Sequence, residues 1–114
     1  KGSPARIMSF SWVALNRVQK LAPDLEIVML IERLVSWKLA KKQLVGRDWI
    51  TGPGMRLLRE NPDFGAKLRR KGRRMHVWTV NRPDDVDLCL DLGVEALITD
   101  VPDQVMRHLS RRGL

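Results

Sequence analysis

The sequence predicts an α/β fold in which short strands alternate with helices and the strands run parallel. Runs of five or six apolar residues, rich in β-branched side chains, recur between segments with helical spacing. These runs do not alternate cleanly between polar and apolar residues, so each indicates a strand buried on both faces. Buried strands that alternate with helices are typical of a parallel sheet covered by helices.

The first half of the chain contains three such strands and two helices. The runs ARIMSF (5–10) and EIVML (26–30) are predicted strands, and a helix is expected between them at 12–21. A second helix is expected at 33–44, followed by an irregular strand in DWITGPG (48–54) that stops at its Gly-Pro-Gly. The apolar residues at helical spacing in the first helix are Trp12, Leu15, Val18 and Leu21.

Regularly spaced prolines mark helix starts in the second half. A proline at the first helical position loses no hydrogen bond, because its amide would have no partner inside the helix. A nearby Asn or Asp side chain can accept from the free amides of the first turn. The prolines are Pro62, Pro83 and Pro102. The expected caps are Asn61, Asn81 and Asp100.

Each of these helices is expected to end at a glycine, which adopts the left-handed conformation most easily. The glycines are Gly72, Gly93 and Gly113. The runs MHVWTV (75–80) and EALITD (95–100) lie between the helices and complete the set of predicted strands.

About five βα units leave two architectures open, a small doubly wound sheet or the C-terminal half of a (β/α)8 TIM barrel, which needs about 250 residues. No strand is followed by a GxGxxG or GxxxxGK loop. The absence of a phosphate-binding loop favours the half barrel.

The composition excludes several classes of protein. The chain is 44% hydrophobic and 30% charged, which is typical of a folded globular domain. No apolar run approaches the roughly 20 residues of a transmembrane helix. The single cysteine, Cys89, cannot form a disulfide framework, so a reducing, cytoplasmic setting is favoured.

The net charge of +8 raises the question of an anionic partner. Basic clusters at 67–74 and 107–113 fall in or after the last turn of a predicted helix, where cations complement the helix dipole. We therefore expect no specific nucleic-acid site. Attraction to an anionic membrane surface is an unspecific alternative.

Candidate functional residues should lie at the carboxyl ends of the strands, where parallel α/β proteins place their chemistry. Only two carboxylates are among them, too few to form a metal site. His76 and His108 are predicted elsewhere, as surface or interface residues. We therefore assign no catalytic residue and no metal ligand in this chain. The strand-end residues are Ser9, Phe10, Glu32, Thr51, Trp78, Thr79, Val80, Asn81, Thr99 and Asp100.

Trp78 has the most informative position of the four tryptophans. It lies two residues before the end of its strand, so strand alternation can point its ring into a barrel mouth as an apolar wall for a ligand. Packing in the core is an equally open alternative. Trp12, Trp37 and Trp49 fit core or sheet-covering positions.

The segment HVWTVNRPDDVDLCLDLGVEALITDVPDQV (76–105) resembles the C-terminal strands of the glycerophosphodiester phosphodiesterases. In that family a WTVN strand leads through a proline-started helix to an ITD-P ending. Upstream, IMSFSWVALNRVQKLAPDLEIVML (7–30) is similar to the family's SF strand, its helix and the next strand. The two segments occur in the family's order and together span nearly the whole chain.

The resemblance implies a TIM barrel that hydrolyses glycerophosphodiesters to glycerol 3-phosphate and an alcohol, using a divalent cation such as Mg²⁺ or Ca²⁺ and two histidines. The family's HRG, HD, E-x-D and E-x-K motifs have no counterpart in residues 1–114 and would precede Lys1. What carries over is Phe10 and Trp78, as substrate-binding residues near the glycerol. We therefore expect residues 1–114 to be an inactive C-terminal part of such a domain.

One alternative stays open. A standalone, noncatalytic βα module could bind a partner, its missing half barrel or a second copy through unpaired strand edges. The segment 31–54 has no clear match to the family, and its role is left open.

Overall fold

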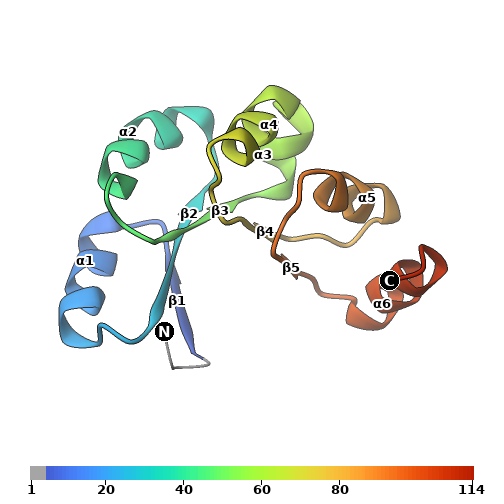
Figure 1. The fold of residues 1–114 in the computed structure, drawn as a ribbon, viewed down its shortest axis with the longest axis horizontal. Helices are drawn as coiled ribbons and strands as arrows, with labels where there is room; N and C mark the ends of the chain where they lie inside the picture. Colours follow the sequence, from blue (N-terminus) through green and yellow to red (C-terminus); the bar gives the residue numbers. More distant parts are fainter. Residues whose placement is uncertain (1–4) are drawn as a thin grey trace.

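A computed structural model describes residues 5–114, and strands and helices alternate along this whole range (Figure 1). The elements are β1 (Arg6–Ser9), α1 (Trp12–Leu21), β2 (Glu26–Ile31), α2 (Leu34–Leu44), β3 (Ile50–Pro53), α3 (Met55–Glu60), α4 (Pro62–Arg70), β4 (His76–Trp78), α5 (Pro83–Asp91), β5 (Ala96–Ile98) and α6 (Pro102–Arg111).

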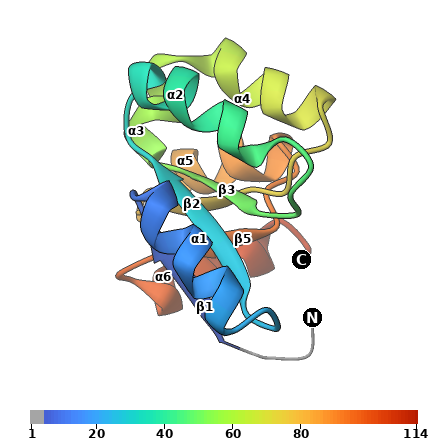
Figure 2. The same ribbon diagram turned by 90° about the vertical axis from the view of Figure 1, so that its left-hand side faces the viewer.

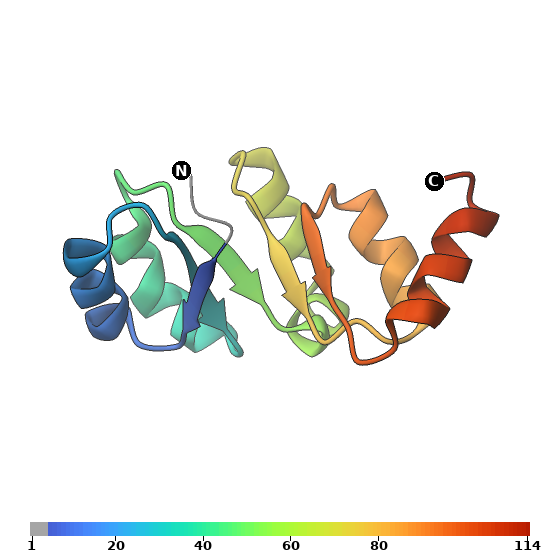
Figure 3. The same cartoon turned by 90° about the horizontal axis from the view of Figure 1, so that it is seen from below.

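The strands lie side by side in sequence order and run parallel, in a three-stranded sheet (β1-β2-β3) and a two-stranded sheet (β4-β5). β1 pairs with β2 and β2 with β3, while β4 pairs with β5, all in parallel. Parallel bridges from Thr51 to Met75 and from Gly54 to Trp78 join β3 to β4. The helices lie on the outer side of the arc, and the other face of the sheet is open (Figures 1 and 3). Helices on one face only exclude the doubly wound sheet, and the fold is part of a (β/α)8 barrel.

The predicted helix boundaries in the second half are confirmed. Each of the three prolines opens its helix, and the three glycines adopt positive φ angles of 69° to 83°. The left-handed conformation at these glycines turns the chain from a helix back toward the sheet.

The capping assignments are wrong. Asn61 occupies the position before α4, but its Nδ2 donates to the Leu57 carbonyl oxygen at 3.0 Å and its side chain caps nothing. The residues that precede α5 and α6 are Arg82 and Val101, so Asn81 and Asp100 lie one residue too early. Their side chains bond to each other across two loops.

The short helix α3 was not predicted. It begins directly after the Gly-Pro-Gly turn, and Gly54 provides no side-chain cap. Its buried residues are Met55, Leu57 and Leu58. Six residues with no capping signal are too few for a periodic pattern to be recognised.

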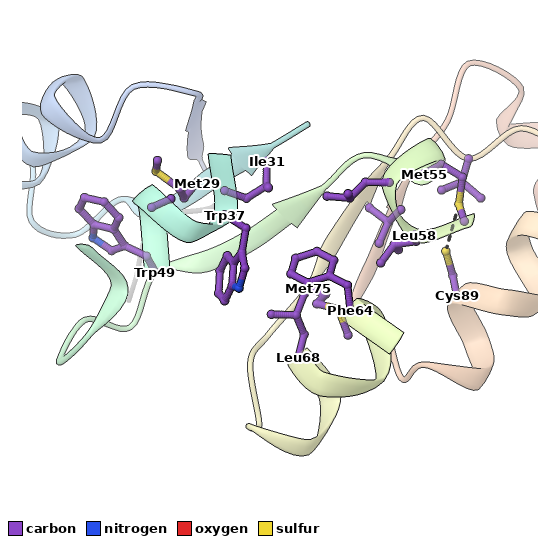
Figure 4. Close-up of a cluster of buried hydrophobic side chains, with 14 of the residues drawn as sticks. Met29, Ile31, Trp37, Trp49, Met55, Leu58, Phe64, Leu68, Met75 and Cys89 are labelled. Carbon is purple, nitrogen blue, oxygen red and sulfur yellow. Dashed lines mark hydrogen bonds between the residues drawn. The ribbon is translucent and has the colours of Figure 1, made fainter. Parts of the chain in front are cut away.

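The hydrophobic core lies between the sheet and its helices (Figure 4). From β2, Ile27, Met29 and Ile31 point into this layer, as alternation along a strand requires. Cys89 is fully buried, and its Sγ lies 3.8 Å from the Met55 Sδ. The helical side of the sheet therefore has a continuous core across all five βα units.

The two ends of the arc expose large apolar side chains. Those near β1 and α1 are Met8, Phe10, Trp12, Val13 and Leu21. Those at the other end are Met106 and Leu114. No helix within residues 5–114 combines the length and the apolar character needed to cross a bilayer.

Candidate functional site

A pocket of about 540 Å³ opens at the carboxyl ends of β2, β3 and β4. Its walls come from the loop after β2, from Gly54 and α3, and from Trp78 and Thr79 at the end of β4. Parallel barrels place their substrate sites at this end of the strands. Its charged side chains are Glu32, Arg33, Arg56, Arg59 and Glu60.

Trp78 is held in one orientation at the edge of this pocket. Its indole Nε1 donates a hydrogen bond of 2.7 Å to the Gly52 carbonyl oxygen on the neighbouring strand. The ring also lies against Gly54, where a Cβ atom would come within 3.2 Å of Trp78 Cζ2. A glycine at position 54 thus leaves room for the indole beside β3.

Phe10 meets Trp78 from the other side. The two ring centroids are 5.7 Å apart and the planes are at 84°, an edge-to-face arrangement. Phe10 follows β1 and Trp78 ends β4, with two strands between them, so the contact lies on the concave side of the sheet. Phe10 remains 54% exposed, which leaves one face of the pair open to a ligand.

Two of the pocket's arginines are already paired. Arg56 bonds to Glu60 at 3.1 Å, and Arg59 lies 3.4 Å from the buried carboxylate of Asp85. Arg56, Arg59 and Glu60 lie in α3, the helix that sequence patterns did not predict. The pocket combines an apolar aromatic wall with a charged rim.

The polar strand-end residues connect two loops. The Asn81 Oδ1 accepts from Thr99 Oγ1 at 2.9 Å and from the Asp100 backbone N–H at 3.0 Å. The Asn81 Nδ2 donates to Asp100 Oδ2 at 3.3 Å. These bonds tie the loop after β4 to the loop after β5. Asn81, Thr99 and Asp100 therefore fix the strand ends next to Trp78.

Among the other strand-end candidates, Ser9 bonds to the backbone and Thr51 is buried in the sheet. The Ser9 Oγ accepts from the Ser11 backbone N–H at 3.0 Å, while the Ser11 Oγ caps α1 by accepting from Ala14. Thr51 is fully buried in β3, and its hydroxyl has no hydrogen-bond partner among residues 5–114. Glu32 is the only carboxylate of the set that lines the pocket.

Neither histidine is at the strand-end face. His76 starts β4 at the opposite edge. Of the surface and interface positions expected for it, the surface position is wrong, since His76 is only 3% exposed. Its Nε2 lies 2.7 Å from Glu95 Oε2. His108 in α6 lies 2.7 Å from Asp87 Oδ1, where Arg112 also binds.

An ion-pair network crosses the amino ends of the strands. Arg74 binds Glu95 at 2.9 Å and Glu26 at 2.8 Å, and Glu26 also pairs with Arg6 at 3.2 Å. Hydrogen bonds from Arg74 hold the pKa of both carboxyls below their ordinary value, against the opposing effect of desolvation. We call Arg6, Glu26, Arg74, His76 and Glu95 the amino-end network.

The described residues do not fit a bound divalent cation. Across residues 5–114, no three side chains of His, Cys, Asp or Glu gather closely enough to hold a metal ion. A hard cation takes six or more oxygen ligands and several carboxylates.

Comparison with known proteins assigns the family. The model of the glycerophosphoryl diester phosphodiesterase family matches residues 1–104. The glycerophosphodiester phosphodiesterase of Bacillus subtilis is 31% identical over 109 residues, which cover 94% of this chain and 36% of that protein. This chain thus spans about two fifths of the length of its relatives.

Solved structures show the same fold. A glycerophosphodiester phosphodiesterase from Parabacteroides distasonis superposes with a TM-score of 0.69 at 23% identity, over 96% of this chain and 44% of that one. An Oleispira antarctica phosphodiesterase in complex with sn-glycerol 3-phosphate gives 0.73 at 16% identity, over 96% and 43%. The chain belongs to the glycerophosphoryl diester phosphodiesterase family.

Proposed function

We propose that residues 1–114 supply the C-terminal βα units and an aromatic substrate wall to a glycerophosphodiester phosphodiesterase barrel. The complete barrel would hydrolyse glycerophosphodiesters to glycerol 3-phosphate and an alcohol, in lipid and glycerol metabolism. The family match and the curated relatives support this reaction class. The observation that carries the role of this chain is the Phe10–Trp78 pair beside the strand-end pocket.

The pair would contact the glycerol part of the substrate. Trp78 is preorganised by its bond to the Gly52 carbonyl and by its contact with Phe10, so substrate binding would not have to order the ring. The apolar faces suit the C–H edge of a glycerol unit, while the charged rim can meet its polar groups. The ligands of the divalent cation and the acid and base would come from residues outside these 114.

The release of glycerol 3-phosphate tests this proposal. The complete protein should release it from glycerophosphocholine in the presence of a divalent cation, whereas the 114-residue chain should release none. Turnover by the purified chain would contradict the proposal that the catalytic groups come from residues outside these 114. No turnover by the complete protein on any glycerophosphodiester would contradict the reaction class.

A second candidate function is supported by the exposed apolar ends of the arc. β1 and β5 have unpaired edges among the described residues, and the side chains beside them are apolar. Such edges pair readily with other strands. The chain could therefore act as a βα module that joins another half barrel or a second copy. We also propose a reducing, cytoplasmic setting, supported by the single buried cysteine.

A further inference from the structure

Helix α2 exposes apolar side chains on the face that points away from the barrel. Trp37, Ala40 and Leu44 pack inward, whereas Val35 is 59% and Leu39 is 72% exposed. Val35 and Leu39 are four residues apart, so they lie together on one ridge. An outward helix face normally carries polar residues, so this ridge has no explanation in the stability of the fold.

The position of α2 separates this ridge from the exposed apolar ends of the arc. On one side α2 packs against α4, where Trp37 and Phe64 meet with ring centroids 5.4 Å apart. On its other side lies α1 (Figure 2). Both neighbours of α2 are therefore already present. If the chain is part of a complete barrel, as proposed above, further βα units join at the ends and leave this ridge open.

Lysines lie along the side of the apolar ridge that faces α4. Lys38 and Lys42 form the adjacent ridge of α2, and Lys41 lies on the side toward α4. There, Lys38, Lys41 and Lys67 line a shallow groove together with Asp63. α2 itself contains no acidic residue. The outer face of α2 thus combines an apolar ridge with a positively charged border on the side toward α4.

We propose that the outer face of α2, defined by Val35, Lys38, Leu39, Lys41 and Lys42, docks the protein onto an anionic lipid bilayer. Apolar side chains flanked by lysines suit the headgroup region, because the lysine stems lie along acyl chains while the ammonium groups reach the phosphates. Contact through the helical wall would leave the strand-end pocket open to soluble substrate.

Vesicle co-sedimentation of the complete protein that carries these residues tests the proposal. The protein should bind vesicles of phosphatidylcholine with 30% phosphatidylglycerol and bind pure phosphatidylcholine at least tenfold more weakly. Raising the salt from about 0.05 M to 0.5 M should lower binding to the anionic vesicles at least tenfold, since exposed charges are screened.

Two variants separate docking by this face from general charge attraction. Lys38→Gln with Lys42→Gln should weaken binding about tenfold or more, as two interfacial lysines are lost. Leu39→Ser should weaken it severalfold with the charge unchanged. The matched control, Arg70→Gln with Lys71→Gln, removes the same charge from exposed positions at the end of α4 and should change binding less than threefold. Circular dichroism establishes that each variant is folded.

Three results would overturn the proposal. One is equal binding to neutral and anionic vesicles, and another is an equal loss in the control variant. The third is a protein that does not sediment with lipid at all, as expected if the face binds a protein instead. Binding is measured without substrate, so these results are independent of the phosphodiesterase reaction.

Discussion

Trp78 is the residue whose position is most closely determined by its neighbours. The Gly52 carbonyl, the Gly54 backbone and the Phe10 ring each restrict the indole, and all three come from other strands or strand ends. Such restraint suits a side chain that binds substrate in the ground state. Its loss should therefore affect binding more than the chemical step.

In the complete enzyme, Trp78→Ala should raise KM about tenfold, equivalent to about 1.4 kcal/mol, and change kcat by less than about threefold. Trp78→Phe should give an intermediate KM, because it keeps an aromatic ring but loses the hydrogen bond to Gly52 and part of the indole surface. Steady-state kinetics with glycerophosphocholine measures both values. An unchanged KM for Trp78→Ala would assign the ring to packing alone.

Cys89 should be unreactive in the folded protein. Burial raises the pKa of its thiol to about 12, with a smaller contribution from the nearby Asp85 carboxylate. At pH 8 only about one thiol in ten thousand would be ionised, and the thiolate is the reactive form. Ellman's reagent should label the native protein at least a hundredfold more slowly than the protein in guanidinium. Rapid labelling of the native state would contradict the buried position.

At the scale of elements, the amino-end network joins β1, β2, β4 and the residues around them. Its carboxyls, Glu26 and Glu95, have a lowered pKa in the folded state. Stability from a lowered carboxyl pKa is fully present above the unfolded value of about 4.5 and is lost as the pH falls through the folded value. The network should therefore stabilise the sheet at neutral pH and cease to do so in acid.

Arg74→Gln tests this pH dependence. The variant should lose about 1 kcal/mol of unfolding free energy at pH 5.5, and the difference from the unsubstituted protein should shrink toward zero near pH 3. Chemical denaturation at several pH values measures it. The matched control is Arg56→Gln, which breaks the exposed Arg56–Glu60 pair and should cost less than about 0.5 kcal/mol. A loss of unfolding free energy in Arg74→Gln that did not change with pH would indicate that Arg74 stabilises the fold by packing and not by its charge.

Sequence patterns predicted the long elements and failed where distant residues interact. Proline starts and glycine ends depend on local backbone geometry, so α4, α5 and α6 were predictable. Asn81 was misassigned because its amide bonds to Thr99 and Asp100, which are 18 and 19 residues away. Capping rules consider only nearby backbone amides, so they cannot predict that distant residues will bond to the Asn81 side chain.

The site was predictable only in part, for the same reason. Phe10 and Trp78 belong to the strand-end residues, and the family resemblance singled them out from that set. Their ring contact depends on the curvature of the sheet, which no local pattern encodes. The burial of His76 was not anticipated, and its contact partner Glu95 lies 19 residues away in the next βα unit. Arg56 and Arg59 in the pocket were missed because α3 is too short to leave a periodic signal.

At the scale of the whole molecule, the exposed apolar ends should govern how the isolated chain behaves. Sedimentation velocity of residues 1–114 should show association that increases between about 5 and 100 μM, because apolar strand edges pair with similar surfaces. Polar substitutions at Trp12 and Val13, both exposed beside β1, should reduce this association. If the chain stayed monomeric at every concentration, this would contradict the view that its terminal strands have unpaired edges able to associate.

The sheet joins each strand only to a neighbour that is adjacent in sequence, with β1 next to β2 and so on to β5. Every pairing therefore closes a loop of modest length, and the loop entropy lost at each step is small. The contact order of this arrangement is lower than that of a sheet whose strands pair across the whole chain, which favours faster folding. Each βα unit of this barrel segment can thus dock on the previous one while the rest of the chain is still leaving the ribosome.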